Sequence, residues 1–128
     1  MLLCRFISLI ILLPLLSLSC SKSSKEKDRE APVVVIEEPV HNAIVTGGQV
    51  LNIRGNVADN EFIHEIHIEI SNLQTGEEYL HVHIHPSSGT HSYSHAFNAV
   101  SGISYLVRVI AEDPSNNVSS QKVEFSAN

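Results

Sequence analysis

Histidine is the residue type that could do chemistry in this chain, because eight histidines occur in only 128 residues. Four of them occupy alternate positions of two short apolar segments, 63–71 and 78–85, and two glutamates share the pattern of the first segment. Imidazole and carboxylate groups without a thiolate suit Zn²⁺, Cu²⁺ or Ni²⁺. The candidate metal ligands are therefore His67, His83, His81, His85, Glu65 and Glu69.

The two segments are predicted to pair as one β-hairpin. Gly76 suits the left-handed position that ends a three-residue loop at 74–76, and this loop makes the numbers of paired residues sum to 150. The apolar positions then share one face, and a slip by one residue would bury the charged set instead. The polar face has three opposed pairs, which are His67 with His83, Glu69 with His81, and Glu65 with His85. Opposed Cβ atoms lie ~4.5–5.5 Å apart, so two imidazoles can share one tetrahedral ion.

The other histidines are weaker candidates. His64 has the parity of Ile66 and is predicted to point inward as a hydrogen-bonded cap of the core. His95 has the parity of Phe97, which predicts partial burial, and His91 follows a loop that brings it near the end of the hairpin. These three are lower-ranked ligands. His41 lies in a turn and carries no further signal.

A second interpretation of the polar face stays open. Outward positions of a half-buried strand carry polar residues in any case, so the histidines could form a solvated face or contact a protein or glycan partner. Asp59, Glu61, Asp113 and Asn116 could form a calcium site if their loops share one pole, although Asp and Asn there are more often turn formers.

Several classes of function are excluded or unsupported. The chain has 8 Lys and Arg against 14 Asp and Glu, for a net charge of −6, so it lacks the basic surface of a nucleic-acid-binding protein. It contains no Gly-x-Ser-x-Gly, no His-Glu-x-x-His and no glycine-rich phosphate loop. We therefore expect no enzymatic activity.

The elements that must position the histidines are short and rich in β-branched residues. Apolar runs recur every ten to fourteen residues between Gly, Asn, Asp, Ser and Pro, without helical periodicity. Seven antiparallel strands in residues 32–128 predict an all-β immunoglobulin-like or fibronectin-like sandwich. The expected strands are 32–37, 49–57, 63–71, 78–85, 91–99, 104–111 and 118–126.

The first 31 residues have the pattern of a processed and tethered N-terminus. Residues 1–19 carry one positive charge and an apolar run that is too short to span a bilayer, which predicts a signal peptide. The sequence Leu16-Ser17-Leu18-Ser19-Cys20 resembles the lipobox of bacterial lipoproteins, in which the Cys receives a diacylglycerol and further acyl chains such as palmitate. Residues 20–31 are then the lipidated Cys20 and a flexible polar tether.

The chain as a whole resembles a family of bacterial lipoproteins of unknown function, which join a lipobox and short tether to a His-rich Ig-like sandwich. The resemblance rests on Cys20 and on the stretches 64–68, 81–85, 93–97 and 105–117. It implies a fold and an anchor on the cell envelope, outer membrane rather than inner, but no activity. The expected function is metal capture or buffering by a membrane-anchored protein, with Zn or Cu as the ion; the alternative is a structural or adhesion module for a protein or glycan partner.

Overall fold

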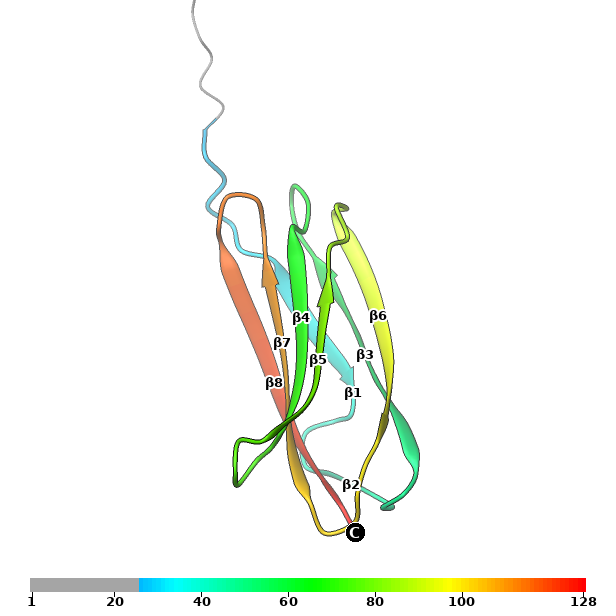
Figure 1. Ribbon diagram of the computed structural model, residues 1–128. Coiled ribbons are helices and arrows are strands. Elements are labelled where there is room, and N and C mark those ends of the chain that lie inside the picture. Colours follow the sequence, from blue (N-terminus) through cyan, green and yellow to red (C-terminus); the bar gives the residue numbers. More distant parts are fainter. Residues whose placement is uncertain (1–25) are drawn as a thin grey trace, which may run out of the picture.

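The computed structural model describes residues 26–128, which form eight β-strands in two sheets packed face to face (Figure 1). The strands are β1 Val33–Glu38, β2 Ala43–Val45, β3 Val50–Ala58, β4 Glu65–Asn72, β5 Glu78–Ile84, β6 Thr90–Asn98, β7 Ser104–Glu112 and β8 Val118–Ala127. One sheet has the order β1-β3-β6 and the other β2-β8-β7-β4-β5. Among the described residues there is no helix that is long and apolar enough to cross a membrane.

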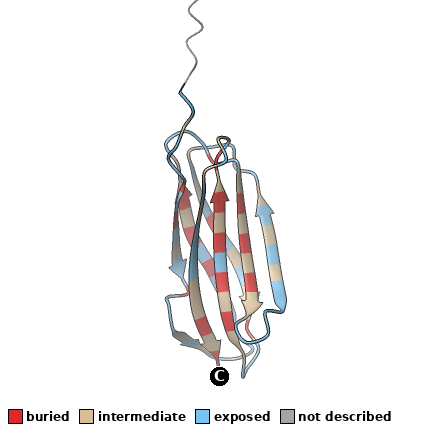
Figure 2. Ribbon diagram, turned by 90° about the vertical axis from the view of Figure 1, so that its left-hand side faces the viewer, coloured by how far each residue is buried: buried red, intermediate tan, exposed pale blue. Residues whose placement is uncertain are grey.

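The core lies between the sheets and is built from alternate residues of each strand. On β4, Ile66, Ile68 and Ile70 are fully buried while the residues between them are only half-buried. Tyr105 and Phe125 from β7 and β8 stack on each other in the same core. Buried and less buried bands alternate along the strands in Figure 2, as the two-residue period of a strand requires. The predicted all-β, fibronectin-like sandwich is confirmed.

An eighth strand, β2, was not expected from the sequence. It has three residues and pairs in parallel with the end of β8. The prediction that all strands are antiparallel is therefore wrong for β2. A parallel partner must come from a distant part of the chain. Here Ala43 pairs with Phe125, so the local sequence, which has the turn residues Pro39 and Asn42 around it, contains no sign of the pairing.

The predicted hairpin register is confirmed by the pairs Ile66–Ile84, His67–His83, Ile68–Val82, Glu69–His81 and Ile70–Leu80. The loop differs, because Asn72 pairs with Glu77 and the loop has four residues, 73–76. Gly76 takes a positive φ of 75° there, as expected. An irregularity next to Tyr79 then shifts the pairing by one residue between Ser71–Glu78 and Ile70–Leu80. This bulge compensates for the longer loop and restores the predicted register.

A close approach of β1 to β3 depends on Gly55. Its backbone lies against the carbonyl oxygen of Val35 and the ring of Tyr93, and a Cβ at this position would overlap both. The Tyr93 hydroxyl donates a hydrogen bond of 2.9 Å to that carbonyl. Burial raises the pKa of Tyr93, so the phenol stays protonated and remains a donor.

The N-terminal part of the described chain contacts one end of the sandwich. The predicted signal peptide and Cys20 lie outside the described residues, as does the first half of the predicted tether. Residues 26–31 run along the pole formed by the β3–β4 and β7–β8 loops (Figure 1). At this pole the Asn117 amide donates to the backbone oxygen of Asp28 and the Asn60 amide donates to its carboxylate. The C-terminus lies at the opposite end of the sandwich.

Candidate metal centre

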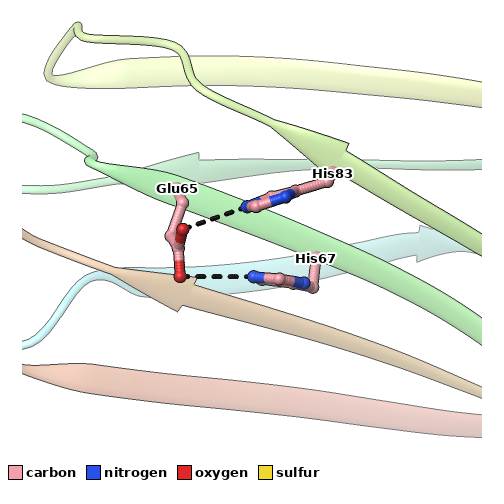
Figure 3. Close-up of side chains that lie close together, drawn as sticks. All are labelled: Glu65, His67 and His83. Carbon is pink, nitrogen blue, oxygen red and sulfur yellow. Dashed lines mark hydrogen bonds and ion pairs between the residues drawn. The ribbon is translucent and has the colours of Figure 1, made fainter.

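Three of the predicted ligands meet on the outer face of the β4–β5 hairpin. One ligand atom each from Glu65, His67 and His83 lies within 4.8 Å of the other two. The Nε2 atom of His67 is 3.3 Å from Oε1 of Glu65, and Nε2 of His83 is 3.0 Å from Oε2. Figure 3 shows the carboxylate facing the edges of both rings. The hairpin register sets His67 opposite His83, and their rings stack with centroids 4.1 Å apart.

These three residues, called the triad below, are held by strands β4 and β5 but are open to solvent. The Glu65 and His67 side chains are each 23% exposed and His83 is 46% exposed. Hydrogen bonds from His83 and then His67 lower the pKa of Glu65, despite some desolvation, so the carboxylate is ionised at neutral pH. An ionised carboxylate beside two imidazoles is a donor set that Zn²⁺ and Cu²⁺ accept.

His81 contacts the triad from behind rather than joining it. Its Nε2 atom lies 3.0 Å from Nδ1 of His67, the ring nitrogen that does not face Glu65. Its own Nδ1 atom lies 3.6 Å from a carboxylate oxygen of Glu78. Glu78, His81 and His67 therefore form a chain of polar contacts that ends on a ligand of the triad. Such a partner fixes which nitrogen of a metal-binding imidazole carries the proton.

Two further predicted ligands are engaged elsewhere. The Glu69 carboxylate accepts hydrogen bonds from Arg108, with its Oε2 atom 2.8 Å from Nε and 2.6 Å from Nη2. The pairing of β4 with β7 sets these two residues opposite each other. His85 directs Nδ1 at the backbone oxygen of His64, 3.2 Å away. The predicted pair of Glu65 with His85 is not among the ladder pairs, because β5 ends at Ile84, and the Glu65 carboxylate reaches diagonally to His83.

The prediction for His64 is wrong. His64 is exposed, and Ile63 is the fully buried residue before β4. The error arises because β4 begins at Glu65, so the parity of the strand cannot be extended back to position 64.

The remaining histidines lie away from the triad. His91 and His95 are half-buried on β6, in the opposite sheet, which agrees with the partial burial expected of His95. His41 accepts a hydrogen bond of 3.3 Å from the backbone N–H of Glu124. Glu65, His67 and His83 are thus the histidine-containing group that the described structure brings within reach of one ion.

A second carboxylate cluster was only partly anticipated. The loops of Asp59 and Asp113 do share one pole, and both carboxylates accept turn-type hydrogen bonds, from the N–H groups of Glu61 and Asn117. The third member is Asp28, from the segment predicted to be tether. Asn116 instead donates to Glu112. The signal for Asp28 was its residue type, because the chain has three aspartates and all three meet here.

Comparison with known proteins supports the fold and does not identify a family. A scan against protein-family models and a search of curated proteins find no match. Among solved structures, the fibronectin(III)-like modules of CbhA from Clostridium thermocellum match at a TM-score of 0.55 and 20% identity, over 77% of this chain. The match spans 47% of that longer chain. A variant of superoxide reductase (neelaredoxin) from Ignicoccus hospitalis matches at a TM-score of 0.49 and 14% identity, over 77% of this chain and 80% of that one. The chain therefore has a fibronectin(III)-like fold.

Proposed function

We propose that this protein is a lipid-anchored, non-catalytic module of the cell envelope that captures or buffers a divalent transition metal, Zn²⁺ or Cu²⁺. The observation that carries the proposal is the convergence of Glu65, His67 and His83 on one point of the β4–β5 face. The histidines come from opposed positions of two strands, so the backbone ladder itself holds their spacing.

The distances within the triad suit a metal ion of this class. Ligand bonds of about 2.0–2.1 Å at tetrahedral angles separate neighbouring ligand atoms by roughly 3.3 Å. The two nitrogen–oxygen distances of 3.3 and 3.0 Å are close to that separation. An ion entering between the three groups would take the places of the two N–H protons that now point at Glu65.

The contact with His81 supports the same site. When Nε2 of His67 binds a metal, a neutral ring keeps its proton on Nδ1, and that N–H can donate to Nε2 of His81. His81 then carries its own proton on Nδ1, which faces the Glu78 carboxylate. Both rings thus change from the tautomer protonated at Nε2 to the tautomer protonated at Nδ1, and the pair loses no proton. The outer contacts therefore favour the metal-binding form of His67.

The exposure of the triad supports capture and exchange rather than permanent structural binding. Three protein ligands leave a fourth tetrahedral position open, whereas structural zinc sites are closed by four. His83 is nearly half exposed, so the ion would remain accessible to solvent and to a receiving protein. Anchoring through Cys20 would hold this exchangeable site at a membrane surface.

Metal titration of the purified protein tests the proposal. Wild type is expected to bind one Zn²⁺ or Cu²⁺ per chain near neutral pH, measured by competition with a chromophoric chelator. His67→Ala and His83→Ala should each weaken binding by at least tenfold, which is about 1.4 kcal/mol. His41→Ala is the matched control, because His41 lies far from the triad, and it should leave affinity unchanged.

Two further outcomes separate the interpretations. Binding should be lost near pH 5, because imidazoles must be deprotonated to bind a metal. Equal affinity in wild type and in the double variant His67→Ala/His83→Ala would eliminate the site. The polar face of the β4–β5 hairpin would then have to bind a protein or glycan partner instead.

A further inference from the structure

The aspartates of this chain meet at the pole of the sandwich where the N-terminal segment arrives. Asp28 precedes β1, Asp59 follows β3 and Asp113 follows β7, so three separate segments each contribute one carboxylate. One oxygen from each lies within 4.8 Å of the other two. The chain has three aspartates against eleven glutamates, and the glutamates are spread from residue 26 to residue 124.

Burial makes this cluster different from ordinary surface acids. Asp113 is completely buried, and it is the one charged residue among the buried side chains of the described part of the chain. The Oδ2 atom of Asp59 is also buried and accepts no hydrogen bond, although Oδ1 accepts one from Glu61 N–H. A buried carboxylate oxygen without a donor costs free energy unless something positive lies against it. The Oδ2 atom of Asp59 is therefore an independent sign that the cluster is completed by a cation.

The donor set indicates which kind of cation. Carboxylates alone, with no imidazole or thiolate, suit a hard cation, and Ca²⁺ accepts six to eight oxygens in irregular arrangements. Mg²⁺ demands a near-ideal octahedron and retains its waters, which is a poor fit to three loops of unrelated geometry. Asn117 is not itself a ligand, because its amide N–H₂ donates to Oδ2 of Asp113 at 2.6 Å and to the backbone oxygen of Asp28 at 3.2 Å; it ties the N-terminal segment to the loop that carries Asp113.

We propose that Asp28, Asp59 and Asp113 form a calcium site that clamps the N-terminal segment to the pole of the sandwich. Two of the ligands belong to the folded domain and the third belongs to the segment that leads away from it. This consequence rests on the proposed function: with the chain anchored through Cys20, calcium occupancy sets how closely the domain is held to its point of attachment. The site is separate from the triad of Glu65, His67 and His83 and does not depend on it.

Calcium titration of the full chain in detergent tests the site directly. Wild type is expected to bind one Ca²⁺ with a Kd on the order of 10⁻⁴ to 10⁻³ M, the range of extracellular modules. Asp28→Asn and Asp59→Asn should each weaken binding at least tenfold. Asp28 precedes the first strand, so its variant keeps the fold even if a change at buried Asp113 does not. Glu30→Gln, an exposed carboxylate two residues away, is the matched control and should bind as wild type does.

Proteolysis reads out the clamp itself. Cleavage after Lys27 by a lysine-specific endoproteinase, followed by the mass of the product that begins at Asp28, should slow at least tenfold when CaCl₂ is added to wild type. Asp28→Asn should show no such protection, whereas His67→Ala/His83→Ala should show it in full. The proposal is overturned if the Asp28→Asn and Asp59→Asn variants bind Ca²⁺ as tightly as wild type. An equal effect of MgCl₂ would overturn the assignment of calcium.

Discussion

His81 allows a quantitative test of how neighbouring residues contribute to metal binding by the triad of Glu65, His67 and His83. We expect His81→Ala to weaken Zn²⁺ binding although His81 is not a ligand, because it removes the partner of Nδ1 of His67. Removing such partners typically weakens metal binding 10–100-fold. The His81 side chain is 42% exposed, so water can take over part of its role. The expected loss is therefore at the lower end, about tenfold or ~1.4 kcal/mol.

A double-mutant cycle separates this positioning role from direct ligation. The Kd for Zn²⁺ is measured by chelator competition in wild type, His81→Ala, His67→Ala and the double variant. Because His81 acts through His67, its removal should cost nothing further once His67 is absent. His81→Gln retains an acceptor and should recover part of the affinity. The reasoning is refuted if His81→Ala causes the same loss with and without His67, since His81 would then bind metal by itself.

Three other predictions follow from the fold, the triad and the N-terminus. Gly55→Ala should destabilise the domain by about 3 kcal/mol in chemical denaturation, because its Cβ overlaps the Val35 carbonyl and Tyr93; an unchanged midpoint would contradict this packing. The lowered pKa of Glu65 means that its ionised form contributes stability above the unfolded-state pKa, and this contribution is lost as the pH falls through the folded-state value. The stability difference between wild type and Glu65→Gln should therefore narrow from about pH 6 to about pH 3, and a constant difference would exclude that contribution. Wild type should partition with membranes and carry acyl mass on Cys20, while Cys20→Ala should remain an uncleaved precursor; a mature N-terminus at any other residue would rule out the lipoprotein prediction.

The hairpin was predictable because its specification is local and redundant. Six apolar residues alternate with six polar ones around one glycine, and only one register buries the first set. The register was predicted correctly although the loop length was not, because the bulge at Tyr79 offsets the extra residue of the loop. The parity of His64 failed for the opposite reason, because nothing in the local sequence marks Glu65 as the first residue of the strand.

The partners of individual site residues were harder to predict than the strands. The pair of Glu69 with Arg108 depends on the register between β4 and β7, which are separated by two other strands in the sequence. Glu65 reaches His83 diagonally, a choice of side-chain rotamer that strand pairing alone does not determine. Asp28 belongs to a segment whose polar composition is typical of a tether, and only the folded pole shows that it has a docking place.

The place of β5 in its sheet gives metal binding a dynamic consequence. β5 is an edge strand that bonds to β4 alone, so it is the strand that local opening should release most easily. His83 is on β5, whereas Glu65 and His67 are on β4, so one ion would bridge the two strands. Opening the edge would then require loss of the ion. Metal occupancy should therefore appear as slowed amide hydrogen exchange along β5, with little change in β1 or β3 of the opposite sheet.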